Sequence, residues 1–157
     1  MLRTPSTIKN SKNSNHSLSN VLFLFLALLV VIGISLELYV SANRVESDFS
    51  SELIRAVNLL VFFTIWTNIL VGVTSFFIAR GKHKKNNWFW GLHLAGLSGI
   101  IVTLIIHRLY LAVPLTGIAL LSDSIIHLLT PLLALCLWLM FGPRGKINLK
   151  TILISTA

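Results

Sequence analysis

The sequence predicts an all-α integral membrane protein, a polytopic bundle of transmembrane helices. Hydrophobic residues make up 55% of its 157 residues and charged residues only 11%, whereas soluble domains carry about 25% charged residues. The apolar residues also fall into runs near the ~20 residues that a helix needs to cross a bilayer. We therefore expect four full spans and a partial fifth, at about 21–42, 56–79, 88–107, 118–141 and 149–157.

The segment before the first span is rich in Ser and Asn, a composition typical of disordered chain. We predict a disordered cytoplasmic tail over residues 1–20 and a transmembrane helical domain over 21–157. The apolar core of the first span is close to 20 residues long, whereas a signal peptide has roughly 7–15. The first span is therefore expected to remain uncleaved.

The cations between the runs predict how the chain is oriented. Ten of the 13 Lys and Arg residues lie in the N-terminal tail and in the second and fourth connections, and three lie on the opposite side. By the positive-inside rule the N-terminus is cytoplasmic. The formal charge of +8 does not form a stripe with interleaved aromatic residues, so we expect no nucleic-acid partner. The expected location is the cell membrane, and the expected partners are membrane lipids.

Two spans carry small and polar residues along one helical face, which we expect to turn inward. In the second span these residues are Thr64, Asn68, Gly72 and Ser75. In the third span they are Gly91, Ala95, Gly99, Thr103 and His107. Four-residue spacing of small side chains lets a neighbouring helix approach closely.

The fourth span places Asp123 and His127 one helical turn apart. A charged group near the bilayer centre costs roughly 2.5–3.5 kcal/mol even on lenient insertion scales, so an ionisable residue there suggests a functional site. Pro131 has no N–H to bond the carbonyl of His127, which predicts a distorted helix beside the histidine.

Thr64 and His127 lie at matching depths, each about nine residues or roughly 13 Å below the outer boundary. A threonine hydroxyl needs a base to accept its proton before it can act as a nucleophile, and neutral His127 is a candidate base. Asp123 would then orient the imidazole, and Asn68 would donate to an oxyanion. The alternative is a non-enzymatic transporter or scaffold, in which Asp123 and His127 satisfy one another or relay protons.

A metal or haem site is disfavoured by the same depth estimate. His107 lies at the outer end of its span, so His127 would be roughly 12 Å deeper, and His93 lies near the cytoplasmic end. We expect no metal ligands and no cofactor. Glu37, near the outer end of the first span, is expected to reach the membrane surface or pair with Arg108.

The segments Phe62-Phe63-Thr64-Ile65-Trp66-Thr67-Asn68 and Asp123-Ser124-Ile125-Ile126-His127, followed by Pro131, resemble the androgen-induced-gene family of multi-pass membrane hydrolases. The chain looks closest to their uncharacterised bacterial six-helix relatives, which also tend to carry a turn like that from Phe141 to Gly145. The resemblance covers roughly residues 21–150.

The resemblance implies an intramembrane hydrolase of fatty-acid esters. In the characterised animal members a threonine and a histidine within the membrane are implicated, and these match Thr64 as nucleophile and His127 as base. The resemblance implies no role for Asp123 and does not identify the lipid substrate. The family has six spans, whereas this sequence has about seven apolar residues after Lys150, so we expect a C-terminally truncated chain.

Overall fold

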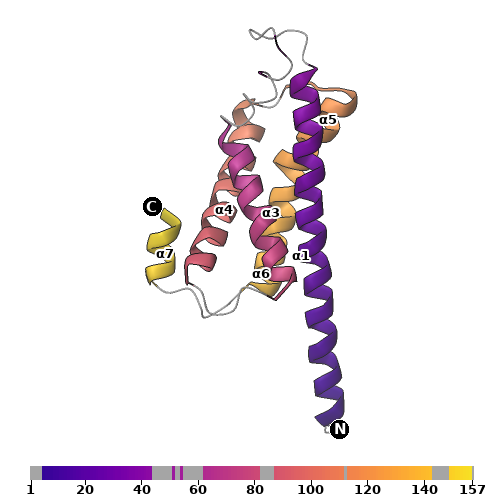
Figure 1. The fold of residues 1–157 in the computed structure, drawn as a ribbon, viewed down its shortest axis with the longest axis vertical. Coiled ribbons are helices and arrows are strands. Elements are labelled where there is room, and N and C mark those ends of the chain that lie inside the picture. Colours follow the sequence, from indigo (N-terminus) through magenta and orange to yellow (C-terminus); the bar gives the residue numbers. More distant parts are fainter. Residues whose placement is uncertain are drawn as a thin grey trace.

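All the regular structure that the computed structural model describes is helical (Figure 1). It describes residues 5–43, 51, 54, 62–81, 87–111, 113–142 and 149–156. The α-helices are α1 (Pro5–Ala42), α3 (Phe63–Ala79), α4 (Asn87–Ile106), α5 (Gly117–Ser124), α6 (Thr130–Phe141) and α7 (Leu149–Thr156). Two π-helical segments, η2 (His107–Leu111) and η3 (Ile125–Leu129), extend α4 and join α5 to α6.

Three helical stretches are long and apolar enough to cross a membrane. They are Ser17–Ala42, Asn87–Leu111 and Gly117–Phe141. The second predicted span appears as the shorter apolar helix Phe63–Ala79, and the expected start of that span at residue 56 lies outside the described residues. The all-helical class of an integral membrane protein is confirmed, while the number of spans and the cytoplasmic N-terminus remain predictions.

The N-terminal segment differs from the expectation of a disordered tail. Helix α1 begins at Pro5 and runs without a break to Ala42, so most of residues 1–20 continue the first span as helix (Figure 1). Proline is favourable at a first helical position because its missing N–H has no intrahelical partner there. Once the apolar part of the helix is formed, each further residue adds a hydrogen bond without a new nucleation cost.

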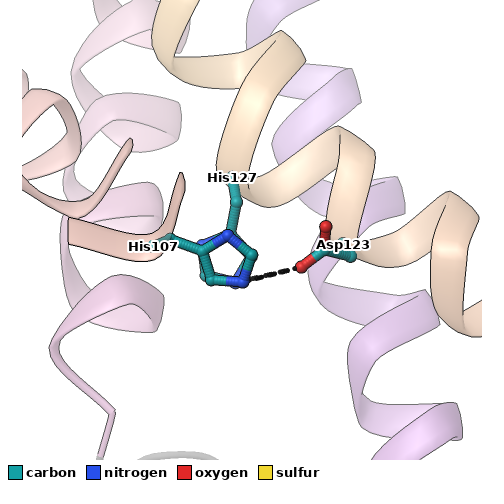
Figure 2. A group of neighbouring side chains, drawn as sticks. All are labelled: His107, Asp123 and His127. Carbon is teal, nitrogen blue, oxygen red and sulfur yellow. Dashed lines mark ion pairs between the residues drawn. The ribbon is translucent and has the colours of Figure 1, made fainter. Parts of the chain in front are cut away.

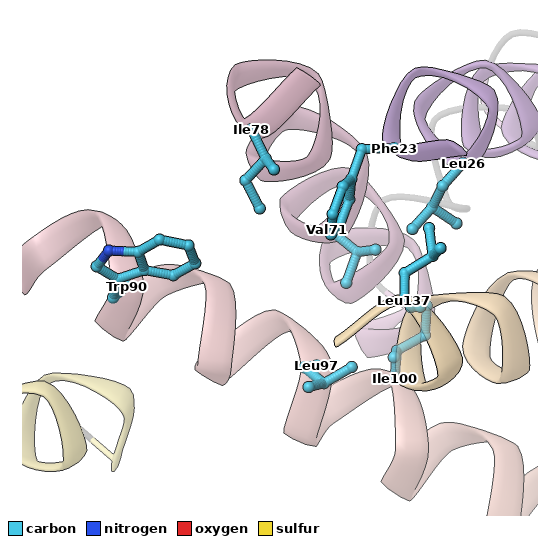
Figure 3. Close-up of a cluster of buried hydrophobic side chains, with 9 residues drawn as sticks. Phe23, Leu26, Val71, Ile78, Trp90, Leu97, Ile100 and Leu137 are labelled. Carbon is cyan, nitrogen blue, oxygen red and sulfur yellow. The ribbon is translucent and has the colours of Figure 1, made fainter. Parts of the chain in front are cut away.

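Four helices contribute side chains to the main hydrophobic core (Figure 3). Helix α1 packs against α3 and against α5 and α6, while α4 packs against α3, α6 and α7. The core includes Phe23 and Leu26 from α1, Val71 from α3, Leu97 and Ile100 from α4, and Leu137 from α6. These helices hold one another in place by direct packing of their side chains.

Small residues set the closest helix contacts. A Cβ atom added at Gly72 would lie 2.9 Å from Val30 Cγ1, and one added at Gly33 would lie 2.7 Å from Ile125 Cγ2. Both distances are shorter than an ordinary van der Waals contact. The inward face predicted for the second span is confirmed for Asn68, Gly72 and Ser75, all of which are buried.

The predicted small-residue face of the third span is also inward. Gly91, Gly99 and Thr103 are buried, and Thr103 donates its hydroxyl to the Gly99 carbonyl. The outer surface, in contrast, carries large apolar side chains on every span. Examples are Phe25, Trp66, Ile105, Leu120 and Met140. Exposed apolar surface of this extent is unusual for a soluble monomer and fits a protein surrounded by lipid.

Candidate functional site

A cavity of about 310 Å³ lies at the end of the bundle where α1 and α4 finish and α3 and α5 begin. Most of its wall is apolar. Its polar lining consists of Glu37, Ser41, Thr64, His107, Asp123 and His127. These residues come from four continuous helical stretches, which are α1, α3, α4 with η2, and α5 with η3. Side chains far apart in the sequence therefore converge on one cavity.

The backbone around His127 is distorted in the place that Pro131 predicts. His127 lies within the π-helical segment η3, and the Thr130 N–H bonds the Ile125 carbonyl, five residues back. Proline cannot donate the bond that His127 would otherwise receive. Single π-helical turns inside α-helices are frequent at functional sites. The distortion is thus a π-turn in a continuous helix.

Asp123 lies beside two histidines whose rings are stacked on each other, and its carboxylate faces the edges of both rings (Figure 2). The His107 Nε2 is 2.9 Å from Asp123 Oδ1, while the His127 Nε2 is 4.0 Å from the same oxygen. The two imidazole rings are nearly parallel, at 5°, with centroids 3.8 Å apart. The Nδ1 atoms of both rings are buried without a hydrogen-bond partner. The aspartate therefore lies closer to His107 than to His127, and both histidines are within ion-pair distance of its Oδ1 atom.

The depth estimate that separated His107 from His127 by roughly 12 Å is wrong. The estimate assumed that the third and fourth spans are straight helices that start at the same depth in the membrane. The His107 and His127 rings are 3.8 Å apart, so the two residues lie at nearly the same depth. Helix α4 continues as η2 beyond His107 to Leu111, so His107 is not at the end of its helical stretch. The sequence did predict that His107 faces inward together with Gly99 and Thr103. It did not predict that His107 contacts Asp123 and His127.

The structure brings Thr64 and His127 to the same cavity but leaves Asn68 outside it. The Asn68 amide donates to the Thr64 carbonyl at 2.9 Å, and Thr67 donates to that carbonyl at 3.0 Å. Both bonds fix the backbone that carries Thr64. Asn68 is fully buried, and nothing in its position supports the expected oxyanion role.

Glu37 is held by a contact that the sequence did not predict. The Ser122 hydroxyl donates to Glu37 Oε2 at 2.5 Å, whereas Arg108 is exposed and forms no ion pair with Glu37. The expectation of a Glu37–Arg108 pair is wrong. Helix α1 therefore contributes an anchored carboxylate to the wall of the cavity. His93 lies elsewhere, buried with its Nδ1 2.9 Å from Thr74 Oγ1.

Comparison with known proteins does not assign the chain to a family. No family description, curated protein or solved structure matches it. The resemblance to membrane hydrolases therefore remains an expectation. The chemistry available is that of the cavity itself: the hydroxyl-bearing residues Ser41 and Thr64, two carboxylates, and two imidazoles that face the same aspartate oxygen.

Proposed function

We propose that the protein is an intramembrane hydrolase of lipid esters, with Thr64 as nucleophile and His127 as base. The observation that carries this proposal is that both side chains line one cavity with mainly apolar walls. Such walls suit an amphiphile whose ester reaches the polar residues. Water exclusion also strengthens the electrostatic interactions available to a transition state.

The ion pairs of Asp123 favour His127 as the base. The carboxylate oxygen lies 2.9 Å from His107 Nε2, whereas its separation of 4.0 Å from His127 Nε2 is too long for a hydrogen bond. The His127 Nε2 therefore remains available to accept a proton. The nearby carboxylate then stabilises the imidazolium that forms during attack.

In the proposed reaction the Thr64 hydroxyl attacks the acyl carbonyl and His127 takes its proton. The proton passes to the departing alcohol, which leaves an acyl-threonine. Water, activated by the same histidine, then attacks this ester, releases the fatty acid and restores Thr64. Covalent catalysis of this kind splits one difficult step into two easier ones.

The test is labelling of the full chain by an electrophilic acyl-type probe in detergent micelles or lipid nanodiscs. Thr64→Ala and His127→Ala are each expected to abolish labelling, and Thr64→Ser is expected to retain part of it. Ser98→Ala is the matched control, because Ser98 is exposed on α4, lies outside the cavity lining, and donates its hydroxyl to the Leu94 carbonyl of its own helix. Full labelling of either alanine variant would refute the assignment.

A second candidate is proton relay without hydrolysis. It is favoured by the direct contact of three titratable groups, His107, Asp123 and His127. In that case Asp123→Asn alters a pH-dependent transport signal in reconstituted vesicles, and Thr64→Ala leaves the signal unchanged. Loss of that signal in Thr64→Ala would argue against the relay.

A further inference from the structure

We propose that His107, Asp123 and His127 form a binding site for a divalent transition-metal ion, with zinc as the ion that fits best. One ligand atom from each of the three residues lies within 4.8 Å of the other two. We take these atoms to be the two Nε2 atoms and Asp123 Oδ1, because both Nε2 atoms lie 4.0 Å or less from that oxygen. Two imidazoles and a carboxylate, with a fourth position open, are a donor set found in catalytic zinc sites.

The separations of the ligand atoms are close to those that an ion requires. Zinc bonds of about 2.0–2.2 Å in a tetrahedron place the ligand atoms roughly 3.3–3.5 Å apart. The two nitrogens are now 2.9 and 4.0 Å from Asp123 Oδ1. Shifts of less than about 1 Å would therefore bring both nitrogen–oxygen pairs into the range that the coordination geometry requires.

The stacked rings must splay when the ion enters. At 5° between the ring planes, the lone pairs of the two Nε2 atoms run parallel and do not converge. Rotation about the Cβ–Cγ bond of each histidine corrects this, and that torsion has a broad energy well. Neither buried Nδ1 atom has a hydrogen bond to break in the rotation.

The charge of the cavity independently points to a cation. Among the residues that the structure describes, its lining contains two carboxylates, Glu37 and Asp123, and no Lys or Arg. A carboxylate in a membrane interior requires a partner. Two ionised carboxylates would offset the charge of one divalent ion. Room for its fourth ligand, a water molecule, is available in the 310 Å³ cavity.

Metal binding does not depend on the proposed hydrolysis, although both would use His127. A metal bound to His127 Nε2 occupies the nitrogen that accepts the proton from Thr64. If both proposals hold, zinc suppresses labelling of Thr64 and a chelator restores it. Failure of the hydrolase proposal leaves metal binding unaffected, because Thr64 is not a ligand.

Metal binding is measured on the full chain, purified with a histidine-free tag and stripped with a chelator. Added Zn²⁺ is expected to remain at one ion per chain after dialysis, and added Co²⁺ to give the visible absorption of a tetrahedral nitrogen–oxygen site. We expect zinc affinity to fall at least about 100-fold in each of three variants, His107→Gln, Asp123→Asn and His127→Gln. Loss of a residue that only hydrogen-bonds to a ligand already lowers metal affinity about 10–100-fold, and loss of a ligand itself should cost at least as much.

Thr64→Val is the matched control, because it alters the cavity wall and keeps all three ligands. It is expected to bind one zinc ion with unchanged affinity. A zinc-induced rise in the melting temperature of the unsubstituted chain gives a second readout that does not depend on the folding of any variant. Absence of retained zinc in the unsubstituted chain, or an unchanged zinc affinity in either His107→Gln or His127→Gln, would overturn the site.

Discussion

The contact between α3 and α4 at Gly99 gives a prediction whose size follows from the structure. A Cβ atom at Gly99 would lie closer than 3.0 Å to Thr67 Cγ2 and 3.1 Å from Phe63 Cζ, whereas one at Gly96 would lie 3.2 Å from its nearest neighbours. Gly99→Ala therefore forces the helices apart. Overpacking of a tight core costs typically 1–3 kcal/mol.

Gly96→Ala is the internal reference for this cost. Both glycines lie in α4, so both substitutions gain the same helix propensity of about 1 kcal/mol. The difference between the two variants thus isolates the steric contact. We expect Gly99→Ala to be less stable than Gly96→Ala by about 1–3 kcal/mol.

A second substitution tests the identity of the obstructing atom. Thr67→Ser removes Cγ2 but keeps the hydroxyl that donates to the Thr64 carbonyl. The Gly99→Ala/Thr67→Ser double variant is expected to recover at least about 0.5 kcal/mol beyond additivity, within the coupling range of contacting residues. Stability is measured by equilibrium unfolding in mixed micelles with increasing SDS. Equal stability of the two alanine variants, or strict additivity in the double variant, would refute the reasoning.

Three further outcomes follow from the contacts of single residues. Ser122→Ala removes the donor to Glu37 and is expected to cost about 1–3 kcal/mol of unfolding free energy; an unchanged SDS midpoint would contradict this. Thr74→Val removes the hydroxyl that lies 2.9 Å from the Nδ1 of buried His93. We expect a similar cost of about 1–3 kcal/mol, measured in the same titration. In an otherwise cysteine-free chain, a cysteine at Ser51 is expected to react with an impermeant maleimide in intact cells, while one near the N-terminus stays protected; the reverse pattern would invert the topology.

The sequence by itself determined the class of the protein and the inward faces of its helices. Hydrophobic runs of about 20 residues have few alternatives to helix in a membrane, because every backbone polar group must be satisfied internally. The 3.6-residue period then places Asn68, Gly72 and Ser75 on one side of α3, and all three are buried. The distortion beside His127 was predictable as well, since Pro131 removes a specific hydrogen bond.

Only the tertiary structure decided which inward side chains meet. Spacing along one helix fixes the angular position of a residue, but it does not fix the stagger or tilt of a neighbouring helix. For that reason the sequence could not place His107 beside Asp123 or Ser122 beside Glu37, two contacts that the fold makes. The stacked histidines at the cavity depend on this inter-helix register, which is set by packing and not by the order of residues in any one span.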